Sequence, residues 1–418
     1  MNYQESLAWL GLRSTLDFDK GVERVAYLLD KLGNPQLSLP TIHFVGTNGK
    51  GSTLNALSFI LRESGYKVGR FTSPSIIDFR EQIVYEEEMI AEEVFAAIVT
   101  DLLPDIADMD KVAGLGSLSE FEIVVVAMFV YFASYHKPDI LLVEAGMGGL
   151  LDATNVLTPL VVACPSIGLD HQAFLGETYA AIAQHKVGVL REGVPLVYAT
   201  DHAEVSRVFE DTAARLHSKT YALGREIVVK DSRAGLSVQT PFTRVEQIHL
   251  SMKGVHQKAN AALAVTCAQL LSNHFPNISE SSIRQGLATA IWPGRQEQLA
   301  PSLLIDGAHN TESIAALIHR LREDYADREI FFLFAAIHTK PVASMLAQLD
   351  EIGPVTVTTF DDERAVGLDG YPKAYPSVAD FRDWLDQAEL TDPSKLYVVT
   401  GSLYFITFVR KYSLEKLL

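Results

Sequence analysis

The segment from Thr41 to Thr53, TIHFVGTNGKGST, constrains the fold of this chain more than any other feature. A short apolar run leads into a glycine-rich turn, which is followed by a lysine, two hydroxyl residues and a helical pattern. A strand, a glycine loop and a helix in this order form a phosphate site, because backbone N–H groups turn toward the anion. The predicted phosphate-binding residues are Gly46, Thr47, Asn48, Gly49, Lys50, Gly51, Ser52 and Thr53.

The loop departs from the general P-loop spacing, which has four residues between its glycines and a hydroxyl directly after the lysine. Here two residues separate the first two glycines, and a third glycine precedes Ser52. The order of strand, loop and helix nevertheless favours a phosphate site over an ordinary turn with a solvated lysine. We expect Lys50 to contact the β- and γ-phosphates, and Ser52 or Thr53 to supply an oxygen to Mg²⁺.

Chain length and net charge limit the possible domain organisation and partners. A chain of 418 residues exceeds one ordinary core, so two domains are expected. The net charge of −17 argues against nucleic acids and anionic membranes as partners. The N-terminus lacks the features of a signal peptide, and the longest apolar run, 123–133, is too short to span a bilayer. Because Cys164 and Cys267 lie in apolar settings and no repeat is present, we predict a cytoplasmic monomer.

Apolar strands alternate with helical patterns along most of the chain, which predicts βαβ units and a mostly parallel sheet. Helices are expected at about 91–103, 119–135 and 179–189, and buried strands at 139–143 and 160–164. Short alternating runs between 220 and 251 indicate a small antiparallel annex. A second α/β series begins near residue 303, so the predicted domains are 1–297 and 298–418.

Polar residues follow several of these predicted strands. Glu144 follows 139–143, His171 comes after 160–164, and Asp306 and His309 follow an apolar strand at 303–305. Open α/β sheets bind ligands at the carboxyl ends of their strands, so Glu144 is a candidate Mg²⁺ ligand. The alternatives are that Glu144 is an ordinary loop acid and that His171 is a hydrogen-bonded structural histidine, since Mg²⁺ prefers oxygen.

Taken together, the motifs resemble those of the folylpolyglutamate synthase/dihydrofolate synthase family, within the Mur ligase superfamily of ATP-dependent amide-forming ligases. The motifs are GTNGKGS at 46–52, TSP at 72–74, EAGMGGLLDATN at 144–155, IGLDH at 167–171, HQKANAALA at 256–264, PGR at 293–295, DGAHN at 306–310 and TGSLY at 400–404. The resemblance covers nearly the whole chain. It implies a P-loop-type ATPase domain with a mostly parallel sheet and a smaller C-terminal Rossmann-like α/β domain, with substrates between them.

The resemblance also implies roles for individual residues. The positions that match metal-binding ones are Ser52, Ser73, Glu144, His171 and Lys186. Lys186 matches a lysine that is carbamylated in the superfamily, which turns a cation into a metal-binding carboxylate. The further nucleotide-binding positions are Asn260, Arg295, Asp306 and His309. The expected cofactors are therefore ATP and two Mg²⁺ ions, and the expected catalytic residues are Lys50, Glu144, His171 and Lys186.

The implied reaction is the activation of a folate or dihydropteroate carboxylate by ATP. Transfer of the γ-phosphoryl group makes an acyl phosphate, and the amino group of L-glutamate then displaces phosphate. The protein mainly positions the reactants and neutralises charge through Lys50, Arg295 and Mg²⁺. Domain closure would keep water away from the acyl phosphate.

Three positions depart from the family pattern. Ser75, Gln82 and Leu150 stand where the family usually has a histidine and two arginines. Because arginine clamps carboxylates with two hydrogen bonds, these neutral residues favour a shifted substrate preference with ATP-dependent activation retained. The expected substrate residues are Ser75, Phe79, Gln82 and Asp152, and the arginines that could replace the lost charge are Arg70, Arg80 and Arg191.

Two alternatives to this reaction stay open from the sequence. One is a diverged Mur-type ligase that makes a different amide bond, and the other is a non-catalytic nucleotide-binding protein. The full set of Lys50, Glu144, His171 and Lys186 favours an enzyme, because a binding module needs no complete metal site. Dihydrofolate synthesis and glutamate-chain elongation are both compatible with these residues.

Overall fold

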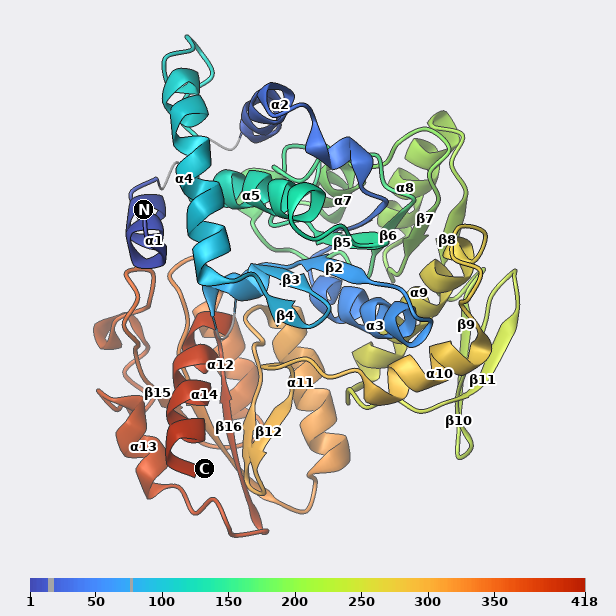
Figure 1. Cartoon of the computed structure of the whole chain (residues 1–418). Coiled ribbons are helices and arrows are strands. Elements are labelled where there is room, and N and C mark those ends of the chain that lie inside the picture. The colour runs from blue at the N-terminus through green and yellow to red at the C-terminus, as the bar shows by residue number, and fades with distance from the viewer. Residues whose placement is uncertain (14–18, 76–77, 418) are drawn as a thin grey trace. The chain divides into compact units, whose positions relative to one another are not determined.

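The chain folds into two compact units, as the computed structural model of residues 1–13, 19–75 and 78–417 shows (Figure 1). The first unit comprises Met1–Ser75, Phe79–Ser251 and Gln257–Ala290, and the second contains Met252–His256 and Ile291–Leu418. The predicted two-domain α/β class is confirmed. The boundary placed between residues 297 and 298 stays a prediction, and the main segment of the second unit begins at Ile291.

The first unit is built on a sheet whose described strands run in the order β4-β3-β2-β5-β1-β6-β7-β8. Within the order β2-β5-β1-β6-β7-β8 each adjacent pair of strands is parallel. Strand β3 pairs antiparallel with β2, and β4 pairs antiparallel with β3. The central strands are buried apolar runs, as parallel strands covered on both faces require. The strands are β1 Thr41–Phe44, β2 Val68–Phe71, β3 Ile83–Tyr85, β4 Glu88–Met89, β5 Ile140–Glu144, β6 Val161–Cys164, β7 Leu196–Tyr198 and β8 Thr220–Ala222.

Helices surround this sheet, and none in the described part of the chain is both long and apolar enough to cross a membrane. They are α1 Tyr3–Gly11, α2 Gly21–Lys31, η1 Pro35–Ser38, α3 Lys50–Glu63, η2 Phe79–Gln82, α4 Glu92–Met109, α5 Glu120–Ser134, α6 Gln172–Leu175, α7 Tyr179–Val187, α8 Ala203–Arg215, α9 Val255–Leu271 and α10 Glu280–Thr289. The helix expected to end at residue 103 continues through Pro104 to Met109. Burial of Ile106 and Met109 in the core stabilises this extension.

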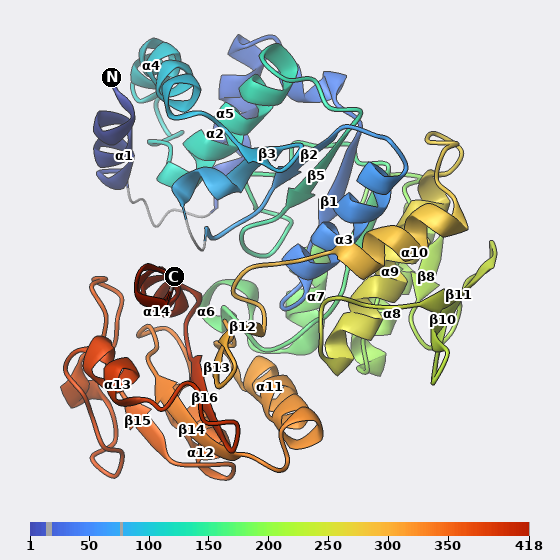
Figure 2. The same cartoon turned by 60° about the horizontal axis from the view of Figure 1, so that its bottom comes forward.

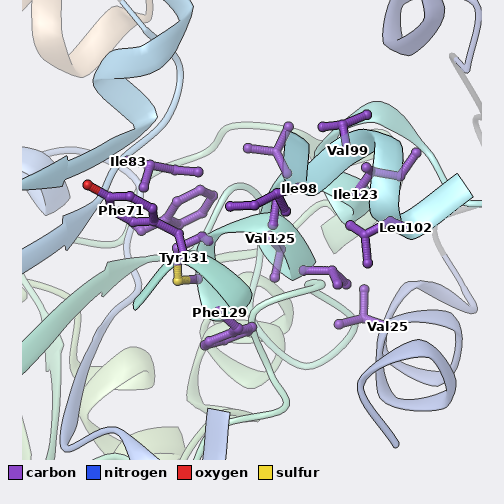
Figure 3. Close-up of a cluster of buried hydrophobic side chains, with 14 of the residues drawn as sticks. Val25, Phe71, Ile83, Ile98, Val99, Leu102, Ile123, Val125, Phe129 and Tyr131 are labelled. Carbon is purple, nitrogen blue, oxygen red and sulfur yellow. The ribbon is translucent and has the colours of Figure 1, made fainter. Parts of the chain in front are cut away.

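One core of the first unit lies where α2, α4 and α5 pack together (Figure 3). Its labelled side chains are Val25, Phe71, Ile83, Ile98, Val99, Leu102, Ile123, Val125, Phe129 and Tyr131. The apolar helix α5 begins at a capping box, in which the Ser119 hydroxyl accepts from the Glu122 amide and the Glu122 carboxylate accepts from the Ser119 amide. The capping box therefore defines the start of α5, and the apolar residues that follow explain its burial.

The predicted antiparallel annex is confirmed as a sheet of order β11-β10-β9 in the first unit. Its strands are β9 Val228–Ser232, β10 Gly235–Gln239 and β11 Arg244–Ile248. The second unit has the sheet β12-β13-β16-β14-β15, parallel except for β12, which agrees with the predicted smaller α/β domain. Its elements are β12 Glu297–Ala300, β13 Leu303–Ile305, α11 Thr311–Asp324, β14 Glu329–Phe334, α12 Val342–Asp350, β15 Val355–Val357, η3 Leu368–Gly370, α13 Phe381–Gln387, β16 Lys395–Thr400 and α14 Leu403–Leu417.

Candidate active site

The glycine loop joins β1 to α3 (Figure 2). Strand β1 lies in the middle of the large sheet, between β5 and β6. Gly49 caps α3 with a φ of 84°, a left-handed value that favours glycine. A Cβ at Gly49 would also lie 2.6 Å from Asn260 Oδ1, and one at Gly46 would lie 3.2 Å from Pro165 Cδ. Both glycines thus allow the tight turn and the close approach of neighbouring segments.

The segment after β6 holds this loop from the side. The Thr47 amide donates to Ser166 O at 2.9 Å, and Thr47 Oγ1 accepts from the Gly168 amide at 2.9 Å. Ser166 Oγ accepts from the Asn48 amide and donates to Asn48 O, both at 2.9 Å. Sequence reasoning gave Ser166 no role. Its position after a buried strand, at the sheet edge where ligand groups gather, was the available signal.

Lys50 and Glu144 lie side by side at the carboxyl ends of neighbouring parallel strands. Lys50 Nζ is 3.7 Å from Glu144 Oε1, and it donates to the carbonyl oxygens of Gly46 at 3.1 Å and Thr47 at 3.4 Å. The strand register pairs Glu144 with Phe44, the last residue of β1. The structure therefore brings the predicted lysine and the predicted carboxylate together beside the glycine loop.

Lys186 reaches the same loop from α7. Its side chain is buried, and Nζ donates to Gly46 O at 2.8 Å. Burial, with the charge of Lys50 as a smaller cause, lowers the pKa of Lys186 to about 7. A substantial share of this amine is therefore neutral at neutral pH. Gly149 packs tightly on the same helix, because a Cβ there would lie 2.7 Å from Lys186 O.

Asp152, which was predicted to bind substrate, is buried and bonded within its own loop. Its Oδ2 accepts from the Met147 amide at 2.8 Å, and its Oδ1 accepts from the Thr154 amide at 2.9 Å and Thr154 Oγ1 at 2.5 Å. Burial raises the pKa of Asp152, while these hydrogen bonds and Lys50 oppose the rise. The structure thus places Asp152 as a support for the loop between β5 and β6.

The other predicted substrate residues follow β2. Ser75 is half-buried, as is the predicted metal ligand Ser73. The Phe79 ring packs edge-on against Phe95 with centroids 5.6 Å apart. Gln82 is buried, and its Nε2 donates to Phe79 O at 3.3 Å. Phe79 and Gln82 therefore contact protein groups, and their role in binding substrate stays a prediction.

His171 follows β6 at the start of a short helix. It precedes the short helix α6 with a φ of 53°, and its side chain is 42% exposed. Its Nε2 is 3.8 Å from Asp170 Oδ2. The position after β6 agrees with the predicted sheet edge, and its role as a metal ligand stays a prediction.

The arginines considered as replacements for the lost family charges are engaged within the first unit. Arg70 is buried and lies 2.9 Å from Glu87 Oε1 through its Nη2. Arg191 Nη2 donates to Asn155 Oδ1 at 2.7 Å, and Arg80 lies 3.7 Å from a glutamate at the start of α4. Each therefore stabilises the protein's own loops and helices.

Helix α9 contacts the start of α3 through two residues one turn apart. Asn260 Nδ2 donates to Gln257 Oε1 at 3.0 Å, and Gln257 Nε2 donates to Ser52 Oγ at 3.5 Å. Sequence reasoning selected Asn260 and missed Gln257. The signal was available, because both belong to the same motif and residues three apart share one helix face.

The predicted nucleotide residues of the second unit form a local cluster there. Asp306 is buried, and its carboxylate accepts from the amides of Ala308 at 2.8 Å and Gln296 at 3.0 Å. Burial raises the pKa of Asp306, and the charge of Arg295 opposes the rise. His309 Nδ1 bonds to the carbonyl of the preceding glycine at 2.8 Å.

The donor chemistry of the loop fits Mg²⁺. Among the described residues, no three or more His, Cys, Asp or Glu side chains form a group that could hold a metal ion. Glu144 and Ser52, beside the glycine loop, offer a carboxylate and a hydroxyl, which are the oxygen donors that Mg²⁺ prefers. Mg²⁺ commonly completes its coordination with water and nucleotide phosphates, so few protein ligands suffice.

Comparison with known proteins extends over the whole chain. No family model matches the sequence. The chain is 35% identical over 424 residues to dihydrofolate synthase/folylpolyglutamate synthase of Bacillus subtilis strain 168, covering 98% of both proteins. The structure resembles Mycobacterium tuberculosis folylpolyglutamate synthase complexed with ADP (TM-score 0.88, 26% identity, 98% of each chain). It also resembles an FPGS–AMPPCP–folate complex (TM-score 0.86, 29% identity, 99% of this chain and 100% of the other). The chain therefore belongs to the folylpolyglutamate synthase/dihydrofolate synthase family.

Proposed function

We propose that this chain is an ATP-dependent ligase that joins L-glutamate to the carboxylate of a folate or of dihydropteroate. The observation that carries the proposal is the pairing of Lys50, on the GTNGKGS loop, with Glu144, which ends the strand next to β1. Membership of the family supports the same activity, and it disfavours the reading as a non-catalytic nucleotide-binding protein. The monomeric state, the cytoplasmic location and the absence of nucleic-acid partners stay predictions.

The reaction proceeds in two displacement steps. A carboxylate oxygen of the acceptor attacks the γ-phosphorus of ATP, and ADP leaves. The amino nitrogen of L-glutamate then attacks the acyl carbon, phosphate leaves, and the nitrogen loses a proton. The loop amides from Gly46 to Gly51 and the Lys50 ammonium hold and neutralise the phosphates during the first step.

Mg²⁺ would be held at this site by Glu144 and Ser52, with Ser73, His171 and carbamylated Lys186 as further ligands. When bound, it supplies positive charge to the phosphate oxygens. The lowered pKa of Lys186 supports the carbamate, because the neutral amine is the form that attacks CO₂ and releases a proton on bonding. The resulting carboxylate would be an oxygen ligand of the kind that Mg²⁺ prefers.

The test is phosphate release from Mg²⁺-ATP and L-glutamate, with dihydropteroate and a reduced folate as separate acceptors. Turnover with dihydropteroate would establish dihydrofolate synthesis, and turnover with a folate would establish elongation. Folded protein that binds ATP but releases phosphate with neither acceptor would contradict the proposal. It would direct attention to Ser75, Gln82 and Leu150, where this chain lacks the family's cations.

The proposed phosphate site on the glycine loop leads to a prediction for Lys50→Ala. Removing this ammonium takes away charge that the transferring phosphoryl group needs, so kcat should fall about 100-fold to 1000-fold. Steady-state phosphate release measures the effect. Lys111→Ala is the matched control, because Lys111 is 74% exposed and its partner is an exposed aspartate one helical turn away. Unchanged activity in Lys50→Ala would refute the assignment of the loop.

A further inference from the structure

A buried series of hydrogen bonds connects β1, the strand before the glycine loop, to the loop after β5. His43 Nε2 is 2.8 Å from Thr154 Oγ1, and Thr154 Oγ1 donates to Asp152 Oδ1 at 2.5 Å. The three residues are 1%, 0% and 2% exposed, respectively. His43 belongs to β1, three residues before the glycine loop begins. None of the roles assigned so far uses His43 or its contact with Thr154.

The proton positions in this chain follow from the donors available. A threonine hydroxyl carries one hydrogen, and Thr154 directs it at the carboxylate of Asp152. With the Asp152 carboxylate ionised, Thr154 Oγ1 can only accept toward His43, so His43 Nε2 carries the ring hydrogen. The other nitrogen, Nδ1, is buried without a hydrogen-bond partner among the described residues. Burial, with Arg191 as a second cause, lowers the pKa of His43 to about 3, so the ring is neutral.

This series of hydrogen bonds ends at the backbone of the loop that begins at Glu144. The second carboxylate oxygen of Asp152 accepts from the Met147 amide at 2.8 Å, and the Asp152 amide donates to Gly149 O at 3.1 Å. The next polar residue, Asn155, donates from Nδ2 to Leu150 O at 2.8 Å. The segment 152–155 thus fixes the loop 144–150, and Thr154 ties that segment to β1.

We propose that His43 and Thr154 are positioning residues of the ligase reaction, which hold the loop after β5 against β1 so that Glu144 stays opposite Lys50. The kinetic part of this inference rests on the proposed function. The arrangement transmits no proton, because the ring keeps one fixed tautomer and stays neutral over the working pH range. It acts through geometry, on a pair of side chains 3.7 Å apart.

If position 43 served stability alone, an apolar side chain would be expected there. The buried Nδ1 without a partner costs free energy that an apolar side chain would avoid. The polar ring is therefore better explained by the bond that it donates to Thr154. A displacement of about 1 Å in a reacting arrangement can cost about 100-fold in rate, which gives such a bond kinetic importance.

Matched substitutions separate the donated bond from the bulk of the side chain. The amide nitrogen of glutamine reaches the position of histidine Nε2, whereas that of asparagine reaches the position of Nδ1. We expect His43→Gln to keep most of kcat and His43→Asn to lose about 10-fold to 100-fold, the cost of a broken buried hydrogen bond. Thr154→Ser should likewise resemble the wild type, and Thr154→Val should resemble His43→Asn.

The kinetic readout distinguishes positioning from simple destabilisation. In the impaired variants kcat should fall for the folded enzyme while KM for ATP changes little, and the double variant His43→Asn/Thr154→Val should lose no more than either single one. Thr266→Val is the control, because Thr266 is equally buried but its hydroxyl donates within its own helix, to Ala262 O at 2.8 Å. Variants that lose stability but keep wild-type kcat would overturn the proposal.

A spectroscopic test decides the proton positions without any turnover. Long-range ¹H–¹⁵N correlation spectra of ¹⁵N-histidine-labelled protein, with His43 assigned by its absence in His43→Gln, should show a neutral ring protonated at Nε2 from pH 5 to 8. A ring protonated at Nδ1, or titrating in this range, would overturn the proposal. If the wild type releases no phosphate with any acceptor, the proposed function fails, and this spectrum still decides the bonding.

Discussion

Lys186 shows how a single residue can be forced toward an unusual charge state by its surroundings. Its amine donates to the Gly46 carbonyl. Burial, with the charge of Lys50 as a smaller cause, lowers its pKa to about 7. In an unfolded chain the same amine stays protonated until about pH 10. Folding therefore removes a proton from Lys186 between these two pH values, which couples stability to pH.

The sign of this coupling gives a prediction. Between pH 7 and 10 the unfolded state holds one more proton than the folded state, so the free energy of unfolding should rise by up to about 1.4 kcal/mol per pH unit. Below pH 7 the contribution is flat and unfavourable, because both states are protonated. Urea unfolding in CO₂-free buffer measures it.

Lys186→Met is the comparison, and it should lack this rise and be at least as stable as the wild type at pH 7. Equal slopes in the two proteins would show that the amine of Lys186 is charged in the folded state. Added bicarbonate should stabilise only the wild type, since the methionine cannot be carbamylated.

Helices α2 and α5 are joined by a buried ion pair, which shows how an element is fixed in place. Arg24 Nη2 lies 2.7 Å from Glu122 Oε1, and Arg24 Nε donates to Glu122 Oε2 at 3.0 Å. Both side chains are almost fully buried. Because Glu122 also closes the capping box at the start of α5, this pair links the helix terminus to the core in Figure 3.

Breaking this pair from one side should be costly. Arg24→Met leaves a buried carboxylate without its counter-charge, and we expect a loss of about 3–5 kcal/mol in the free energy of unfolding. Adding Glu122→Gln should recover much of it, because the amide keeps an oxygen for the Ser119 amide without the charge. Arg244→Met, in an exposed pair, should change stability by less than about 0.5 kcal/mol. A similar loss of stability in Arg24→Met and Arg244→Met would contradict the role of burial.

The elements that the sequence predicted share strong local signals. Helix α5 has a capping box and an apolar run, and β5 has an uninterrupted apolar pattern. Strand β12 was missed because its residues, Glu297–Ala300, are polar or half-exposed and become a strand by pairing with β13. Helix α4 passed its expected end because burial outweighed the local cost of Pro104.

The whole molecule contains separate hydrophobic cores in its two units. One core of the first unit surrounds α5 and another surrounds α7, whereas the second unit has cores around β14 and α14. Chains with several cores commonly depart from two-state unfolding. Tryptophan positions help here, since Trp9 belongs to the first unit and Trp292 and Trp384 belong to the second.

We therefore expect the two units to unfold in separate transitions. In a Trp292→Phe/Trp384→Phe variant, Trp9 fluorescence should follow the first unit, and far-ultraviolet circular dichroism should follow both. Mg²⁺-ATP at 100 times its Kd should stabilise the folded state of the first unit, which contains the glycine loop, by about 2.7 kcal/mol. The same addition should leave a Lys50→Ala protein nearly unchanged. Coincident transitions by both probes would contradict independent units.

Site prediction from sequence reached the residues with local motifs and stopped at those whose partners are distant. Lys50, Glu144 and Lys186 could be selected because each follows a recognisable pattern. Thr154 received no role, because its contact with His43 joins segments 111 residues apart. Gln257 could have been selected from its motif, but its contact with Ser52, across 205 residues, could not be predicted. Such contacts depend on the order of strands in the finished sheet, which a single sequence does not specify.

The central place of β1 has a consequence for how the protein is made. Its neighbours β5 and β6 begin at Ile140 and Val161, and Ser166 completes the loop's support, so all of these are translated long after the glycine loop. A nascent chain stalled before Ile140 should therefore bind no ATP. One stalled far enough beyond Ala290 for the first unit to leave the ribosome should be retained on immobilised ATP. The enzyme would thus gain its nucleotide site at a late and definite moment of its own synthesis.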